Sequence, residues 1–347
     1  MTRRLVVALM ALVACGCVQD PASVQPVVPT PSAKGVYILN EGYFGQGNSA
    51  LSYYDLQSFA VYPDAFKAVN GRSLGDVGNQ VVLRGGRGYV VVNNSNRIEV
   101  FDAQTIVGLG TIALGSGTSP RQLAFVSDSI GLVTNLYDNS VFVLNLYRGS
   151  IEKRIPVGDN PEGIAIAGGK AVVANSGFGS GNTVTVIALD VLQAVRTLRV
   201  GENPQGVVAL PDGEVCVVCG GSYGDFANPA DDTPARLYFV DPLREWVTDS
   251  LLIGGHASTI ALGPGGIAYV PATDAVRTVD VTRRRTIGDF VAGSYYGVAV
   301  EELTGDVYLT DVQNYAGPGK VVVFSPAGEV RTTIQVGLIP GSMAFKR

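Results

Sequence analysis

Short apolar runs rich in Val and Ile alternate along the chain with turns rich in Gly, Pro and Asp. Such runs are typical of β-strands, and uninterrupted ones are typical of sheets that are buried on both faces. One phrase recurs between them: a turn, often a Pro, a small or polar residue and an apolar triplet. Its strongest copies are VGDNPEGIAI (157–166) and VGENPQGVVA (200–209), and five weaker copies align with them.

The spacing of this phrase predicts the fold. Aligned on the Pro, the seven copies centre on residues 78, 120, 161, 204, 257, 295 and 340. The intervals of 42, 41, 43, 53, 38 and 45 residues are typical of four-stranded propeller blades. Each unit contains four candidate strands, so we predict an all-β, seven-bladed β-propeller. A six- or eight-bladed propeller, or a pair of sandwiches, fits the number of copies less well.

The two ends of the chain are expected to complete one blade. Residues 36–75 supply only three strands, and residues 342–347 form a spare strand with the pattern of an innermost one. Pairing them closes the ring and removes the free sheet edges that would favour aggregation. We therefore expect the C-terminal strand to join the first blade. Residues 189–198 could form a helix by themselves, but their place in the repeat predicts a strand.

The N-terminal segment has the features of a secretion signal followed by a tether. Residues 5–13 form an apolar run that is too short to span a bilayer. The sequence LVAC (12–15) resembles a bacterial lipobox, which predicts lipidation of Cys15 rather than Cys17. An ordinary signal peptide, cut nearby without lipidation, is the alternative. The expected boundaries are 1–14 for the signal peptide, 15–33 for the lipidated Cys and a Pro-rich extended tether, and 34–347 for the propeller.

Composition excludes several classes of function. The net charge is −5 and only 16% of the residues are charged, which excludes a nucleic-acid-binding surface with a basic excess. His256 is the single histidine, so His–His metal sites are ruled out. Cys216 and Cys219 point to opposite faces of a predicted strand, and we expect two buried thiols. Because no nucleophile, base and orienting group occur together, we predict a monomeric binding protein without enzymatic activity, metal or cofactor.

Acidic residues recur where the turns between third and fourth strands begin. These positions hold Asp55, Asp102, Asn145, Asp241 and Asp280. Such a row can suggest a metal or acid–base centre, but Asp and Asn at turn starts normally accept hydrogen bonds from their own backbone. We therefore expect turn capping. Asp225, Asp231 and Asp232 could bind Ca²⁺, but they lack a recognised loop spacing.

The other end of the blades carries the candidate binding surface. Four loops between second and third strands are long and Gly-rich, with aromatic residues that strand packing does not need. The residue after each aligned Pro position is expected at the mouth of the central channel, where polar groups suit a small polar ligand. The candidate ligand-binding residues are Tyr43, Phe44, Asn79, Arg121, Glu162, Phe178, Gln205, Tyr223, Phe226, Tyr296 and Tyr315. Ser258 and Gly341 complete the predicted ring. Mutual packing of the aromatic residues, and solvation of the channel mouth, are the alternatives without a ligand.

Several stretches carry a family resemblance. LVTN (132–135) and YLTD (308–311) resemble the motif of YVTN-repeat propellers. Three longer stretches, 37–55, 69–105 and 304–330, are similar to the YncE-like surface propeller lipoproteins of Bacteroidota-type bacteria. One branch of that group captures cobalamin, a corrinoid, for a TonB-dependent outer-membrane transporter. The resemblance, which extends from about residue 35 to the end, therefore implies an outer-membrane lipoprotein with a corrinoid ligand and such a transporter as partner.

Three points stay open at this stage. The acidic residues expected after the lipidated Cys are reduced to Asp20, so the protein could face the cell surface or the periplasm. A structural or adhesion propeller could use the aromatic face to bind a protein or a glycan. An enzyme of the propeller lactonase or dehydrogenase type is disfavoured by the scarcity of His.

Overall fold

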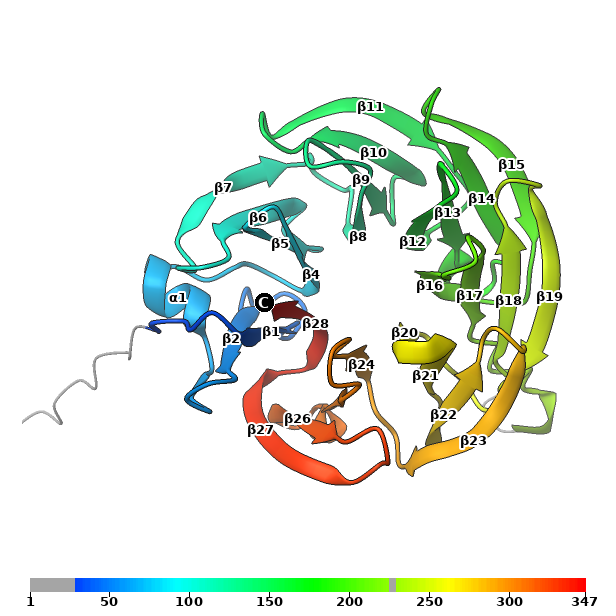
Figure 1. Cartoon of the computed structure of the whole chain (residues 1–347). Helices are drawn as coiled ribbons and strands as arrows, with labels where there is room; N and C mark the ends of the chain where they lie inside the picture. Colours follow the sequence, from blue (N-terminus) through cyan, green and yellow to red (C-terminus); the bar gives the residue numbers. More distant parts are fainter. Residues whose placement is uncertain (1–28, 225–228) are drawn as a thin grey trace, which may run out of the picture.

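Seven β-sheets surround a central axis in the computed structural model of the protein, which describes residues 29–224 and 229–347 (Figure 1). Within these residues each sheet contains four antiparallel strands. The predicted all-β, seven-bladed propeller is confirmed. We number the blades from 1 to 7 and name their strands from the axis outward.

The strands of the blades have the following bounds. Blade 1 contains β28 (Pro340–Lys346), β1 (Gly35–Asn40), β2 (Ala50–Asp55) and β3 (Val61–Tyr62). Blade 2 contains β4 (Gly78–Arg84), β5 (Arg87–Val92), β6 (Arg97–Asp102) and β7 (Gly108–Ala113). Blade 3 contains β8 (Pro120–Phe125), β9 (Ile130–Asn135), β10 (Ser140–Asn145) and β11 (Ser150–Pro156). Blade 4 contains β12 (Pro161–Ala167), β13 (Lys170–Asn175), β14 (Thr183–Ala188) and β15 (Gln193–Arg199). Blade 5 contains β16 (Pro204–Ala209), β17 (Val215–Cys219), β18 (Arg236–Asp241) and β19 (Trp246–Leu252). Blade 6 contains β20 (Ala261–Leu262), β21 (Ile267–Pro271), β22 (Ala275–Asp280) and β23 (Arg285–Ala292). Blade 7 contains β24 (Gly297–Val300), β25 (Val307–Asp311), β26 (Pro318–Phe324) and β27 (Val330–Leu338).

Burial follows the position of a strand within its blade. The second strands, such as β13 and β17, are almost completely buried because a neighbouring blade covers each face. The outermost strand β15, over the segment whose strand character was ambiguous, is exposed at six of its seven positions. Its place in the repeat therefore outweighed its local helical pattern, and the predicted strand is confirmed.

The hydrophobic core is divided into slabs between neighbouring blades. Cys216 packs with residues of blades 5 and 6, whereas Cys219 packs with residues of blades 4 and 5. The two thiols thus lie on opposite faces of β17, free and buried, as predicted. Burial raises the pKa of both thiols above the ordinary range.

Strand β28 closes the ring. It pairs antiparallel with β1, so that Phe345 lies opposite Val36 and Met343 opposite Ile38. The expected closure of the first blade is confirmed, and the strand begins two residues earlier than predicted. Both side chains pack into the slab between blades 7 and 1, which joins the two ends of the chain in one hydrophobic cluster.

The recurring phrase forms the loop that leads into each innermost strand, which we call the lead-in loop. In blade 4, Asn160 adopts left-handed backbone (φ 47°), and its carbonyl accepts a hydrogen bond from the Ser176 N–H (3.1 Å). Pro161 then begins β12. At Gly163 a Cβ would overlap the carbonyl oxygen of Gln205 in the next blade. The phrase is therefore a turn, a strand start and a close contact between blades.

One short helix was not predicted. Helix α1 (Ala65–Asn70) follows the two-residue strand β3 and lies at the outer edge of the ring (Figure 1). Asp64 caps its first turn by accepting the Lys67 N–H, and the buried Phe66 anchors it. The other short helical turns in the described residues are η1 (Gly177–Gly179), η2 (Pro229–Asp231), η3 (Pro264–Gly266) and η4 (Gln313–Tyr315).

The acidic residues at the turns between third and fourth strands cap those turns. Asp55 Oδ1 accepts the N–H groups of Gln57 and Ser58, both at 2.9 Å. Burial alone would raise the pKa of Asp55, but the N–H groups of Ser58, Ser32 and Gln57 hold it below its usual range. The other turns of this type repeat the contact, at Asp102, Asn145, Asp241 and Asp280. The prediction of turn capping is confirmed.

Two sequence predictions fall on residues outside the described part. Cys15, with the signal peptide and most of the tether, precedes residue 29, and Phe226 lies within 225–228. The described residues include no helix that is long and apolar enough to cross a membrane.

Candidate functional site

The predicted polar ring lines one cavity on the axis. The seven ring positions all contribute to its wall, and its volume is about 340 Å³. They are Asn79, Arg121, Glu162, Gln205, Ser258, Tyr296 and Gly341. Five of them follow the first residue of an innermost strand directly, because the phrase begins that strand at the Pro position. The register of the repeat therefore brings residues from all seven blades to one site.

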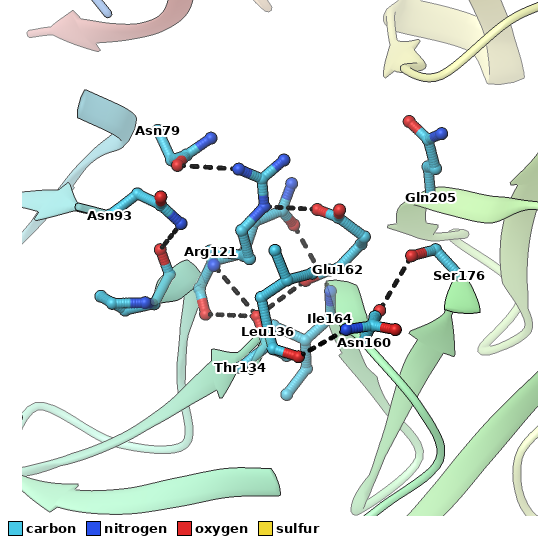
Figure 2. Close-up of polar contacts among 12 residues, drawn as sticks. Asn79, Asn93, Arg121, Thr134, Leu136, Asn160, Glu162, Ile164, Ser176 and Gln205 are labelled. Carbon is cyan, nitrogen blue, oxygen red and sulfur yellow. Dashed lines mark hydrogen bonds and ion pairs between the residues drawn. The ribbon is translucent and has the colours of Figure 1, made fainter. Parts of the chain in front are cut away.

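One half of the ring is locked by hydrogen bonds among its own members. The Nε of Arg121 donates to Oε2 of Glu162 (2.5 Å), and its Nη1 donates to Oδ1 of Asn79 (3.0 Å), as Figure 2 shows. Thr134 Oγ1 donates to the Glu162 carbonyl (2.7 Å), which fixes β12 against β9. Burial alone would lower the pKa of Arg121, but the Glu162 carboxylate raises it. The guanidinium is therefore a fixed, paired cation.

The other half of the ring is less constrained. In Figure 2 Gln205 lies apart from the pair formed by Arg121 and Glu162. Its Nε2 donates to Oδ1 of Asn203 (2.8 Å), so the amide oxygen stays available. Ser258 is exposed to the cavity. Within the described residues, the Gln205 amide oxygen and the Ser258 hydroxyl are the groups of this half that can still pair with a ligand.

A carboxylate that sequence reasoning missed lies beside the ring. Gly341 has no side chain to offer, and Glu41 takes its place from the end of β1. Oε1 of Glu41 accepts the Tyr296 hydroxyl (2.9 Å). Burial raises the pKa of Glu41 to about 6, against the opposing effects of Tyr296 and Arg121. The positions equivalent to Glu41 in blades 2 to 5 are uncharged, at Asn93, Leu136, Ser176 and Gly220. A charged residue at a position that is uncharged in blades 2 to 5 is the sequence feature that could have revealed Glu41.

A side pocket of about 280 Å³ opens next to the axial cavity. It shares Gln205, Ser258 and Tyr296 with the cavity, and Tyr223 and Tyr295 also line it. The left-handed residue of the lead-in loop occurs in five blades, at Val77, Ser119, Asn160, Asn203 and Ile339. The lead-in loops of blades 6 and 7 do not repeat it, and their innermost strands have only two and four residues. The side pocket lies where the repeat is interrupted.

The single histidine connects two loops in the wall of this pocket. Nδ1 of His256 lies 3.0 Å from the Gly220 carbonyl oxygen, and Nε2 lies 3.3 Å from Oδ2 of Asp232. Its ring stacks on Tyr223, with centroids 3.7 Å apart. These contacts hold the long loop of blade 5 against the lead-in loop of blade 6. No group of three His, Cys, Asp or Glu side chains in the described residues could hold a metal ion.

The predicted aromatic residues divide into two sets. Tyr296 lines the axial cavity, and Tyr223 lines the side pocket. Tyr315 lies edge-on to Tyr296, with centroids 6.2 Å apart, and its carbonyl accepts the Tyr43 hydroxyl (2.9 Å). These rings therefore connect the cavity to the rim.

Two further aromatic side chains point elsewhere. Phe44 and Phe178 are 74% and 63% exposed and do not line the axial cavity. Among the described candidate aromatic residues Tyr296 lines the axial cavity, so a contact of Phe44 and Phe178 with a ligand at the channel mouth stays a prediction. Phe178 packs against Tyr137 (centroids 5.7 Å apart), a 60% exposed residue of blade 3 that the sequence reasoning missed. The loop that carries Tyr137 is short, so loop length in the sequence did not single this residue out.

Comparison with known proteins adds a family and a fold. Residues 34–338 match the family described as a domain of unknown function, DUF5074. The chain belongs to this family. No curated protein matches the chain in sequence.

Solved structures share the architecture of this DUF5074 protein. A quinonprotein alcohol dehydrogenase-like protein from Bacteroides thetaiotaomicron is 16% identical, with a TM-score of 0.66, and the match covers 91% of this chain and 79% of that one. Hydrazine synthase from Kuenenia stuttgartiensis is 18% identical, with a TM-score of 0.64 and coverage of 77% and 89%. At these identities the similarity shows the propeller fold alone.

Proposed function

We propose that this propeller is a binding protein that captures a small polar ligand in its axial cavity. The observation that carries the proposal is the cavity of about 340 Å³, to which every blade contributes a wall residue. Ligand pockets typically have volumes of about 300–1,000 Å³ and a few precisely placed polar groups. The locked half of the ring supplies fixed charges, and the open half supplies hydrogen-bonding groups. We assign recognition rather than catalysis to these groups.

The direction in which the chain leaves the propeller supports an anchored receptor. The Ser32 N–H donates to Oδ2 of Asp55 (2.8 Å), and the Leu56 N–H donates to the Lys34 carbonyl (3.2 Å). Both contacts lie at the ends of the blades opposite the axial cavity. Anchoring through a lipid on Cys15 would thus present the cavity away from the membrane. This geometry suits an outer-membrane lipoprotein that passes its ligand to a TonB-dependent transporter.

A corrinoid is the finer form of the proposal, and it rests on the resemblance to YncE-like lipoproteins. A corrin ring with its amide side chains is larger than the axial cavity, so it would lie across the mouth. Arg121 and Gln205 would then face its amides, and Tyr296 and Tyr315 would contact its apolar surface. Aromatic side chains provide such contact area at low entropic cost.

A second candidate function rests on Phe44 and Phe178. Both side chains are exposed on the face that carries the cavity, and Phe178 adopts left-handed backbone (φ 52°). Bulky residues rarely adopt that conformation, and it occurs where the surrounding structure compensates for its cost. Exposed aromatic side chains are typical anchors of interfaces. They favour a protein or glycan partner on the rim, as an alternative to a ligand on the axis.

Calorimetric titration with cobalamin, with haem as the control ligand, tests the proposal. Arg121→Ala removes a central polar group, and Arg196→Ala on the exposed outer strand β15 is the matched control. If cobalamin binds at the mouth, we expect Arg121→Ala to weaken binding about tenfold or more, and Arg196→Ala to leave it unchanged.

Absence of cobalamin binding at micromolar concentrations by a folded protein would overturn the corrinoid form. Binding that survives Arg121→Ala but is lost on Phe178→Ala would favour the rim over the axial cavity. Binding of a protein or glycan partner that depends on Phe44 and Phe178 would establish the second candidate.

A further inference from the structure

We propose that the axial cavity selects ligands that carry a protonated amine, and that Glu41 with the Tyr296 ring forms the ammonium site. This inference rests on the proposed function, because it takes the axial cavity as the ligand site. It adds the chemical class of the group that is recognised.

The charges along the cavity wall do not balance. Its described wall residues include three ionisable side chains that carry full charges, Glu41, Arg121 and Glu162. Arg121 is paired with Glu162 and hydrogen-bonded to Asn79. In the described residues no Lys, Arg or His forms a salt bridge with Glu41. The described wall thus holds two carboxylates and one cation, and a cationic ligand beside Glu41 would balance the charge.

Glu41 and Tyr296 both border the open space of the axial cavity, which has a volume of about 340 Å³. A Cβ on Gly341 would come within 2.9 Å of Oε1 of Glu41 and 3.5 Å of Cε1 of Tyr296, so a glycine is needed here to keep the approach to both groups open. An ammonium group of a ligand in the cavity can then form a charge-assisted hydrogen bond of about 2.7–2.9 Å to the carboxylate. The Tyr296 ring borders the same space and offers a cation–π partner within about 6 Å.

The hydrogen bonds of Glu41 leave acceptor capacity for the ligand. A carboxylate offers about four lone-pair sites. Glu41 uses one of them, on Oε1, for the Tyr296 hydroxyl, and Oε2 accepts no hydrogen bond from the described residues. The overall charge of −5 also favours the approach of a cation.

The proposal predicts a pH dependence with a defined sign. The titratable groups that face Glu41 are Tyr296 and Tyr315 from blade 7, Arg121 from blade 3 and Glu162 from blade 4. Burial raises the pKa of Glu41 to about 6, so the carboxylate is mostly neutral near pH 5 and ionised near pH 8. The ammonium group of an alkylamine keeps its charge across this range. Amine binding should therefore strengthen as the pH rises through about 6.

The test compares tyramine with tyrosol, which carries a hydroxyl in place of the ammonium group. We expect the purified protein to bind tyramine at least about tenfold more tightly than tyrosol near pH 8, and about tenfold more weakly near pH 5 than near pH 8. Glu41→Gln should remove the preference for tyramine and its pH dependence. Glu152→Gln, on the exposed strand β11, is the matched control and should change neither. Gly341→Ala should weaken tyramine binding without changing any charge.

Three results would overturn the inference: equal affinities for tyramine and tyrosol, an unchanged affinity for tyramine in Glu41→Gln, or no tyramine binding at millimolar concentration. Thermal melts of each variant show whether the fold is intact. Binding of tyrosol or cobalamin without a preference for amines would leave the proposed function standing. If neither tyramine, tyrosol nor cobalamin binds to the folded protein, both the inference and the proposed function are wrong.

Discussion

The ionised form of Glu41 should destabilise the ligand-free protein, and Glu41→Gln should relieve that cost. The folded protein raises the pKa of this carboxyl from 4.5 to about 6, chiefly by burial. Below about pH 4.5 the carboxyl is protonated in both the folded and unfolded states, so it carries no penalty. As the pH rises through about 6, the unfolded state already holds the ionised form, which the folded state disfavours. Stability is therefore lost as the pH rises from about 4.5 through about 6.

The magnitude follows from the same values. A pKa raised from 4.5 to about 6 corresponds to about 2 kcal/mol of folding free energy at neutral pH and above. A Gln side chain resembles the protonated carboxyl, and its amide oxygen can still accept the Tyr296 hydroxyl. The free energy of unfolding of Glu41→Gln should thus exceed that of the wild type by up to about 2 kcal/mol near pH 8. The difference should vanish near pH 4.

Urea denaturation of the purified protein across this pH range provides the measurement, because a shift in the midpoint at constant slope reports stability. Glu162→Gln is the matched control. The same substitution there removes the carboxylate that pairs with Arg121, so it should lower the stability near pH 8. Two outcomes would refute the reasoning: stabilisation by Glu41→Gln that does not depend on pH, or the same sign for both variants.

Three further predictions concern the fold and the anchor. Gly163→Ala should lower the free energy of unfolding by about 1–3 kcal/mol because the added methyl meets the next blade, whereas Gly317→Ala, with open space around it, should be neutral; equal melting points would contradict this. Truncation before Ser342 should abolish cooperative melting because it unpairs β28 from β1, and an unchanged melting temperature would remove the closure argument. Cys15→Ala should release the protein from the membrane fraction, and labelled palmitate that still enters this variant but not Cys17→Ala would show the assignment to be wrong.

The repeat made the architecture predictable from the sequence. The phrase carries three separate constraints, which are the left-handed Asn160, the strand start at Pro161 and the small Gly163 against the next blade. The left-handed turn recurs in five blades and the Pro in four copies, so enough marks stand at fixed positions for the copies to be aligned. Because the ring residue lies inside the phrase, Arg121 and Glu162 could be placed at the channel mouth from register alone.

Features that depend on contacts between distant segments were not predictable in this way. Glu41 reaches the ring because the C-terminal strand places Gly341 beside it, across about 300 residues of sequence. Helix α1 is short, and its stability comes from the buried Phe66 rather than from helix propensity. The directions of Phe44 and Phe178 depend on left-handed turns in their loops, and aromatic composition alone does not specify these directions.

Departures from the repeat explain why the cavity is asymmetric. Perfect copies would give seven equal positions around the axis. The locked half keeps the regular backbone of the repeat, and there Arg121 joins the side chains of the two neighbouring blades. The lead-in loops of blades 6 and 7 lack the left-handed turn, and there the wall opens into the side pocket. At the closure of the ring, Gly341 leaves room for Glu41. A uniform ring cannot orient an asymmetric ligand, whereas a fixed ion pair facing an unpaired carboxylate can. Substitutions of the cavity residues and of the lead-in loops of blades 6 and 7 should thus alter ligand preference, while substitutions in the repeat away from the cavity, such as Gly163→Ala, should mainly alter stability.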